Sequence, residues 1–145
     1  MSLHGTYDSD NVFAKIMRGE MPAAVITEEE HVIAIMDAFP QTRGHCLVIP
    51  KAPSRNLLEA APKDLGRVFG LAQRVAQAVN DAFNPDGIII SQFNGAPAGQ
   101  TVFHTHVHIL PRYNMADMAE HASGQMANMG DLEALAAEIR AKLTD

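Results

Sequence analysis

The arrangement of this chain follows from nine residues, His104-Thr105-His106-Val107-His108-Ile109-Leu110-Pro111-Arg112. Three histidines alternate there with β-branched residues, a pattern that predicts a strand. In a strand, side chains two positions apart share one face. The imidazoles would thus lie about 6.5–7 Å apart along one face, while Thr105, Val107 and Ile109 fill the other; a helix would scatter them. The stretch therefore predicts a strand that presents three groups titrating near neutral pH.

Three interpretations fit this histidine row. It is the polar face of a half-buried strand, or it binds a metal such as zinc, or its imidazoles act as nucleophile and acid–base groups. Metal binding is weakened because the strand carries no carboxylate and the only cysteine, Cys46, is far away in sequence. Neutral imidazole attacks phosphorus without a metal, so we favour catalysis that requires no cofactor.

A small-residue loop precedes the row, Asn94-Gly95-Ala96-Pro97-Ala98-Gly99-Gln100-Thr101-Val102-Phe103. Its glycines and proline predict a tight loop that brings backbone close to whatever lies above the histidines. Such loops can aim backbone N–H groups at phosphate oxygens, and Gln100 and Thr101 add side-chain donors. The loop and the histidine row together indicate a phosphate site.

The segment Gly99–Leu110 resembles the signature of the histidine triad superfamily, His-x-His-x-His followed by two apolar residues. Gly44-His45-Cys46-Leu47-Val48-Ile49-Pro50-Lys51 is similar to the family's other hallmark strand. Phe13–Ile16 with Met21–Ala23 resembles its N-terminal helix and turn, so the resemblance covers about residues 10–113. It implies binding of a purine nucleotide and hydrolysis or transfer at an α-phosphorus through a nucleotidyl-histidine intermediate. The substrate would be a nucleoside phosphoramidate or a dinucleotide polyphosphate.

The resemblance also assigns catalytic roles. It makes His106 the nucleophile, which must be neutral at the attacking nitrogen, with its other nitrogen bonded to a backbone carbonyl. His108 would stabilise phosphoryl oxygens and His104 would support the geometry, while His45 is a core histidine or part of a shared hydrogen-bond relay. The predicted catalytic residues are His106, His108, His104, His45, Gln100 and Thr101.

A substrate pocket is predicted around Asp37, eight residues before His45. A lone aspartate before a loop is usually a turn former, but by resemblance Asp37 accepts hydrogen bonds from the ribose. Val12, Phe13 and Ile16 form an apolar helix face that is either core or the border of a base pocket. The predicted substrate-binding residues are Asp37, Phe13, Val12, Ile16, Ile35, Ala38, Asn94 and Gly99.

One departure from the family concerns zinc. Some bacterial members hold a structural zinc with a Cys-x-x-Cys pair in the N-terminal helix. Asn11 and Ala14 occupy those places here, so we predict no bound metal.

The composition of the chain restricts the class of protein to which it can belong. With 145 residues, 47% of them apolar and 19% charged, the chain fits one soluble globular domain. A single cysteine fits a reducing cytoplasm. No apolar stretch approaches the roughly 20 residues that span a bilayer, and a net charge of −6 argues against a nucleic-acid surface.

The predicted fold class is α+β, with an antiparallel sheet of about five strands and one long helix packed on it. Residues 1–9 are expected to be a flexible tail, residues 10–113 the histidine-triad-like domain, and residues 114–145 an extension of that domain ending in a helix capped by Asp131. The expected elements are a helix to about Gly19, strands at 24–28, 31–37 and 45–49, a helix at 62–83 and a strand from Ile88. The long helix is expected to bury Leu65, Val68, Phe69, Ala72, Val75, Ala76 and Val79.

In relatives that helix contributes to a homodimer interface, so we expect a homodimer. Three interpretations stay open for the methionines near the C-terminus: irregular core, contacts with a partner, or a lid over the site. These residues are Met115, Met118, Met126 and Met129. Three functions remain in view: a nucleotide hydrolase or transferase, a nucleotide-binding adaptor with incidental turnover, and a metal-dependent hydrolase built on the histidine row.

Overall fold

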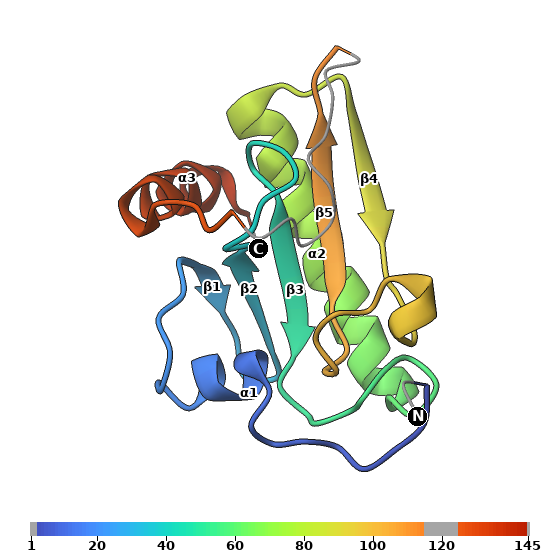
Figure 1. Cartoon of the computed structure of the whole chain (residues 1–145). Coiled ribbons are helices and arrows are strands. Elements are labelled where there is room, and N and C mark those ends of the chain that lie inside the picture. Colours follow the sequence, from blue (N-terminus) through green and yellow to red (C-terminus); the bar gives the residue numbers. More distant parts are fainter. Residues whose placement is uncertain (1–2, 115–124, 145) are drawn as a thin grey trace.

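The computed structural model describes residues 3–114 and 125–144. Its strands form one antiparallel sheet in the order β1-β2-β3-β5-β4 (Figure 1). The strands are β1 (Val25–Glu28), β2 (Val32–Met36), β3 (Cys46–Pro50), β4 (Gly87–Ser91) and β5 (Val107–Arg112). The helices are α1 (Val12–Met17), α2 (Pro62–Phe83), the 3-10 turn η1 (Ala96–Ala98) and α3 (Met129–Lys142). The predicted α+β class is confirmed, and no helix in the described ranges is long and apolar enough to cross a membrane.

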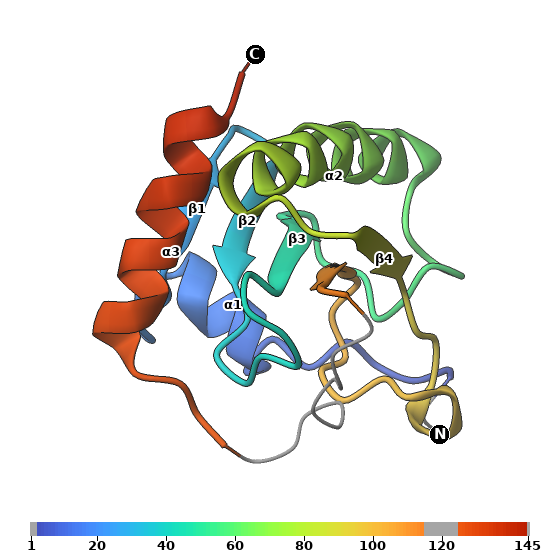
Figure 2. The ribbon, with the colours of Figure 1, turned by 90° about the horizontal axis from the view of Figure 1, so that it is seen from above.

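Helices cover both faces of the sheet (Figure 2). Helices α2 and α3 pack on one face, where alternate residues such as Val48 and Ile109 point into the larger core. Helix α1 covers the other face through Phe13, against Ile35 and Leu47. Because Leu47 pairs with His108 in the β3–β5 ladder, the histidine face is the one that α1 covers.

Helix α2 has the predicted bounds because both of its ends are set locally. Pro62 occupies its first turn, where a missing N–H costs nothing, and Asn84 ends it in the left-handed conformation at φ 49°. The prediction that Phe69 is buried is wrong, since this side chain is 45% exposed. The buried stripe runs through Val68, Leu71 and Val75, and Phe69 lies on its far flank, 100° around the helix from Val68.

Strand β5 begins at Val107, three residues later than the alternation predicts. Its ladder with β3 ends at the pair Val48–Val107. Two residues further along β3, Pro50 has no N–H to donate. Its carbonyl accepts instead from Nε2 of His104 at 2.7 Å, and the N–H of Thr105 bonds to Ser54 O at 2.9 Å. Only His108 of the three histidines therefore stands on a regular strand.

The two ends of the chain also differ from expectation. Residues 3–9 do not form a free tail, because Asn56 donates to the carbonyl of Leu3 and the hydroxyl of Tyr7 bonds to His104. Helix α3 is capped by Asn128, whose side chain accepts from the N–H of Asp131, so Asp131 lies in the first turn. Met115 and Met118 lie outside the described residues.

Candidate active site

The apolar and polar residues predicted for a nucleotide meet around one cavity. Its walls come from α1, from the end of β2 and from the residues on either side of the start of β5. The predicted residues that line it are Val12, Phe13, Ile16, Ile35, Asp37, Ala38, Thr101, His106 and His108. An apolar pocket with a few polar groups at one end is the usual form of a small-molecule site.

His106 has its tautomer set by the backbone. Its Nδ1 lies 2.6 Å from the carbonyl oxygen of His104. A carbonyl can only accept, so Nδ1 carries the proton and the lone pair of neutral His106 is on Nε2. The ring stands between Phe13, with centroids 4.8 Å apart, and His108, with centroids 5.0 Å apart. In its neutral form, His106 therefore has Nε2 as its one nucleophilic nitrogen, and the residue lines the cavity.

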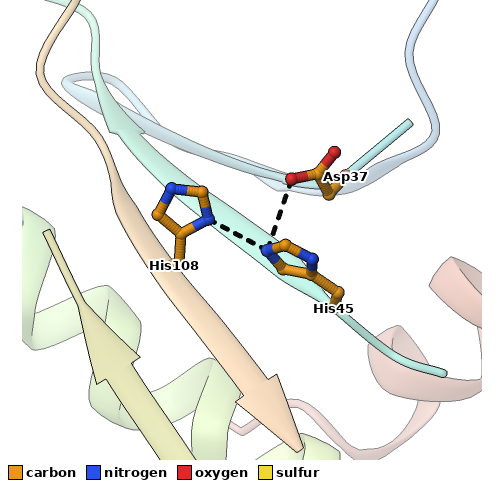
Figure 3. Close-up of side chains that lie close together, drawn as sticks. All are labelled: Asp37, His45 and His108. Atoms are coloured by element: carbon orange, nitrogen blue, oxygen red, sulfur yellow. Dashed lines mark hydrogen bonds and ion pairs between the residues drawn. The ribbon is translucent and has the colours of Figure 1, made fainter. Parts of the chain in front are cut away.

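His45, His108 and Asp37 form a second group of polar contacts (Figure 3). The N–H of Gln41 donates to Nδ1 of His45 at 3.1 Å, so the proton of neutral His45 is on Nε2. This Nε2 lies 2.9 Å from Nδ1 of His108 and 3.3 Å from Oδ2 of Asp37. Nδ1 of His108 therefore accepts, and neutral His108 keeps its proton on Nε2. A backbone N–H thus determines, through His45, which nitrogen of His108 is a donor.

His104 does not line the cavity but lies behind it, fully buried. Its Nε2 donates to the Pro50 carbonyl, so its Nδ1 accepts from the hydroxyl of Tyr7 at 2.6 Å. Burial lowers the pKa of His104, although the hydrogen bond to Pro50 opposes this shift. The residue is a neutral group held at both ring nitrogens.

Three predicted residues brace the loop beside the cavity and are not among those that line it. The amide nitrogen of Gln100 donates to Arg55 O and Val102 O, and its oxygen accepts from Gly95 N. The side chain of Asn94 accepts from the N–H of Leu57. Gly99 ends η1 at φ +107°, a conformation that favours glycine. The loop is thus held largely by its own side chains.

Comparison with known proteins identifies this arrangement, since residues 18–115 match the HIT domain. The chain belongs to the histidine triad (HIT) family. Protein hit of Bacillus subtilis is 42% identical over 106 residues, 73% of this chain and 73% of that protein. Adenylylsulfatase HINT3 of Arabidopsis thaliana is 37% identical over 107 residues, 74% of this chain and 54% of that protein. A HIT-like protein from Bartonella henselae, whose structure is described as that of a protein involved in cell-cycle regulation, aligns with a TM-score of 0.88 and 44% identity, over 95% of this chain and 100% of the other.

Asp37, His45 and His108 of this HIT chain offer three potential metal ligands within 4.8 Å of one another. Their hydrogen bonds fit a metal poorly. A metal on Nε2 of His45 would displace the proton to Nδ1, where it would face the N–H of Gln41. The donor set suits a proton relay better. At the places of the family's zinc cysteines, Asn11 caps α1 and Ala14 is buried, and neither side chain offers a thiolate.

Several residues that line the cavity of this HIT chain were not predicted from the sequence. Leu47 could have been found, because it lies two residues from His45 on the same face of β3. Met129 and Leu132 belong to α3, and the N–H of Ala127 bonds to the carbonyl of Ala38 beside the cavity; no local pattern links these segments. The missed lining residues include Pro22, Ala23, Phe39, Leu47, Val102, Met129 and Leu132.

Proposed function

We propose that this chain is a nucleotidyl hydrolase or transferase in which Nε2 of His106 attacks the α-phosphorus of a purine nucleotide. The observation that carries the proposal is the 2.6 Å bond from Nδ1 of His106 to the His104 carbonyl. With the proton on Nδ1, neutral His106 has its lone pair on Nε2, and it lines the same cavity as Asp37. Similarity to a histidine triad nucleotide-binding protein from Sulfolobus tokodaii and to the adenylylsulfatase HINT3 supports the same chemistry.

The reaction has two displacements. In the first, the Nε2 lone pair of His106 forms a phosphorus–nitrogen bond, and the bond from phosphorus to the leaving amine, phosphate or sulfate breaks. The leaving group takes its electron pair and, where it is basic, a proton that Thr101 or a histidine relays. In the second, a water oxygen attacks the phosphorus, the phosphorus–nitrogen bond breaks, and the released proton passes to solvent. His106 returns to its neutral state with the nucleoside monophosphate as product.

His108 stabilises the charge that builds on the phosphoryl oxygens. Its Nε2–H is a donor in the resting state because Nδ1 accepts from His45. A donor oriented before the reaction needs no reorganisation, which makes such stabilisation the largest catalytic term in many enzymes. Gln100, Asn94 and Gly99 contribute by holding the loop that carries Thr101.

The nucleoside occupies the apolar part of the cavity. The ribose hydroxyls donate to Asp37, and the purine lies between the α1 residues and the wall formed by Ile35 and Ala38. The leaving group extends toward Thr101, which is exposed at the mouth of the cavity. A phosphoramidate, a dinucleotide polyphosphate and an adenylyl sulfate all present an α-phosphorus in this way.

A substrate panel tests the proposal. The protein is incubated with an adenosine phosphoramidate, diadenosine polyphosphates and adenylyl sulfate, with and without a chelator, and AMP release is measured beside AMP binding. Metal-independent release of AMP from at least one of them is expected. AMP binding without turnover would instead favour an adaptor, and turnover lost with the chelator would favour a metal-dependent hydrolase.

We further propose that the protein is a cytoplasmic homodimer. Its one cysteine, Cys46, is a buried free thiol, as suits a reducing compartment. Strand β4 is at the edge of the sheet, and Ile89 and Ile90 on it are 38% and 44% exposed. An exposed apolar edge strand favours pairing with another chain. Ile90→Glu should yield a monomer by sedimentation, whereas Met126→Glu, at another exposed apolar residue, should not; two dimeric variants would contradict this interface.

A further inference from the structure

We propose that Tyr7 is a positioning residue of this active site, whose hydroxyl holds His104 and thereby the carbonyl that orients the nucleophile His106. Its catalytic consequence rests on the function proposed above. The hydrogen bonds that define it exist in the resting protein and can be tested without a substrate.

The hydrogen bonds from Asn11 to His106 run in one direction. The amide of Asn11 donates to the oxygen of Tyr7 at 2.8 Å, which leaves the hydroxyl proton for Nδ1 of His104 at 2.6 Å. The Nε2–H of His104 then donates to the Pro50 carbonyl at 2.7 Å. The backbone carbonyl of the same His104 accepts from Nδ1 of His106. Each group has the donor or acceptor that its neighbour requires.

His104 needs these bonds because its segment lacks those of the sheet. It precedes β5, whose ladder with β3 ends at Val107. Besides the hydrogen bonds of His104 itself, this segment is held by the next residue, Thr105. Its side chain and its N–H both bond to Ser54. A hydroxyl that fixes one ring nitrogen of His104 therefore helps to fix the direction of the His104 carbonyl.

Tyr7 contacts His104 from outside the nucleotide cavity. It is not among the residues that line the nucleotide cavity, and its ring meets that of His104 edge to face, with centroids 5.6 Å apart. Substrate binding should therefore depend little on Tyr7. Loss of its hydroxyl should lower the rate of the chemical step, because a donor is removed from the group that orients His106.

The first test is Tyr7→Phe, which keeps the ring and removes the hydroxyl. A fall in kcat of about tenfold is expected, the effect of one neutral hydrogen bond, with KM nearly unchanged. The matched control is Tyr113→Phe, which removes the chain's other tyrosine hydroxyl. That hydroxyl donates to the Arg43 carbonyl at 2.6 Å, the same length as the bond from Tyr7 to His104, and its loss should leave kcat at the wild-type value.

A second variant, Asn11→Asp, separates the relay from folding. Asp retains the side-chain oxygen that caps α1 by accepting from Ala14 N. It also replaces the donor to Tyr7 with an acceptor, which draws the Tyr7 proton away from His104. Asn11→Asp should therefore lower kcat as Tyr7→Phe does, while thermal unfolding shows that α1 remains folded.

Nitrogen-15 NMR of histidine-labelled protein gives the readout that needs no activity. In the wild type, His104 should be a single Nε2–H tautomer whose Nδ1 signal is that of a hydrogen-bonded acceptor. In Tyr7→Phe and Asn11→Asp that signal should move downfield, and in Tyr113→Phe it should stay. An unmoved His104 signal would overturn the proposal, as would kcat values equal to that of Tyr113→Phe. If the wild type turns over no nucleotide, the proposed function fails while the NMR experiment still decides the role of Tyr7.

Discussion

Replacing Asp37 with Asn changes the polar end of the cavity by one oxygen and one charge. The carboxylate is largely enclosed, with 15% of the side chain exposed. Its Oδ1 accepts from the N–H of Phe39 at 2.8 Å, and its Oδ2 lies 3.3 Å from Nε2 of His45. A carboxylate oxygen can accept more than one hydrogen bond, and a ribose hydroxyl needs one such acceptor.

The expected loss of AMP affinity follows from the hydrogen-bond acceptors that the substitution removes. In Asp37→Asn the amide oxygen keeps the bond from Phe39, and an NH2 group replaces the oxygen that faces His45. The ribose then loses at least one hydrogen bond to a charged acceptor, which contributes about 1.5–3 kcal/mol. AMP affinity should fall about 10- to 150-fold.

Titration calorimetry with AMP and with 2′-deoxy-AMP measures the effect. The wild type should prefer AMP, and the preference should shrink in Asp37→Asn because the ribose hydroxyls have lost their acceptor. Asp64→Asn makes the same change in the first turn of α2, where Asp64 pairs with Arg67, and should leave both affinities unaltered. If Asp37→Asn binds AMP as tightly as Asp64→Asn does, Asp37 is not the ribose acceptor.

Two further predictions concern stability. Gly44→Ala should lower the free energy of unfolding by about 2–4 kcal/mol in urea titrations, because φ is +90° and a Cβ would lie 3.0 Å from the Phe83 ring and 3.2 Å from Pro111. Gly66→Ala, in α2 with open space around it, should raise it by about 0.5–1 kcal/mol; equal effects would refute the steric reasoning. Burial holds the pKa of His104 below its ordinary value. The contribution of this neutral, buried histidine to the free energy of unfolding is therefore fully present above about pH 6.5, and it is lost as pH falls through the folded-state pKa. Urea titrations across that range should show a smaller acid loss in His104→Asn than in wild type, and an equal loss would contradict this assignment.

The parts of the fold that the sequence predicts are those with local signals. Helix α2 has the predicted bounds because Pro62 and Asn84 set its two ends. The predicted start of β5 at His104 is wrong. The true start depends on the facing strand, where Pro50, which is remote in sequence, cannot donate to the ladder. Phe69 was misplaced because periodicity gives the spacing of a buried stripe more reliably than its edges.

The residues of the site also divide into those with a local sequence signal and those without one. The tautomer of His106 follows from chemistry that the residue types already require, and its bond to a backbone carbonyl is as predicted. The substrate-binding roles of Asp37 and of the base pocket are predictions from a family resemblance, since a lone aspartate before a loop carries little information. Tyr7 and Met129 had no local signal, because Tyr7 meets a histidine 97 residues away and Met129 reaches the cavity from the last helix.

Covalent labelling of the nucleophile tests the central claim most directly. A substrate labelled with radioactive phosphorus at the α-position is mixed with the protein, and the reaction is quenched during turnover. The account predicts an acid-labile, alkali-stable label on the peptide that contains residues 104–108, absent from His106→Ala, whose turnover should be lower by several orders of magnitude. A His106→Ala protein that still hydrolyses its best substrate within about tenfold of wild type would contradict covalent catalysis and make direct attack by water the better account.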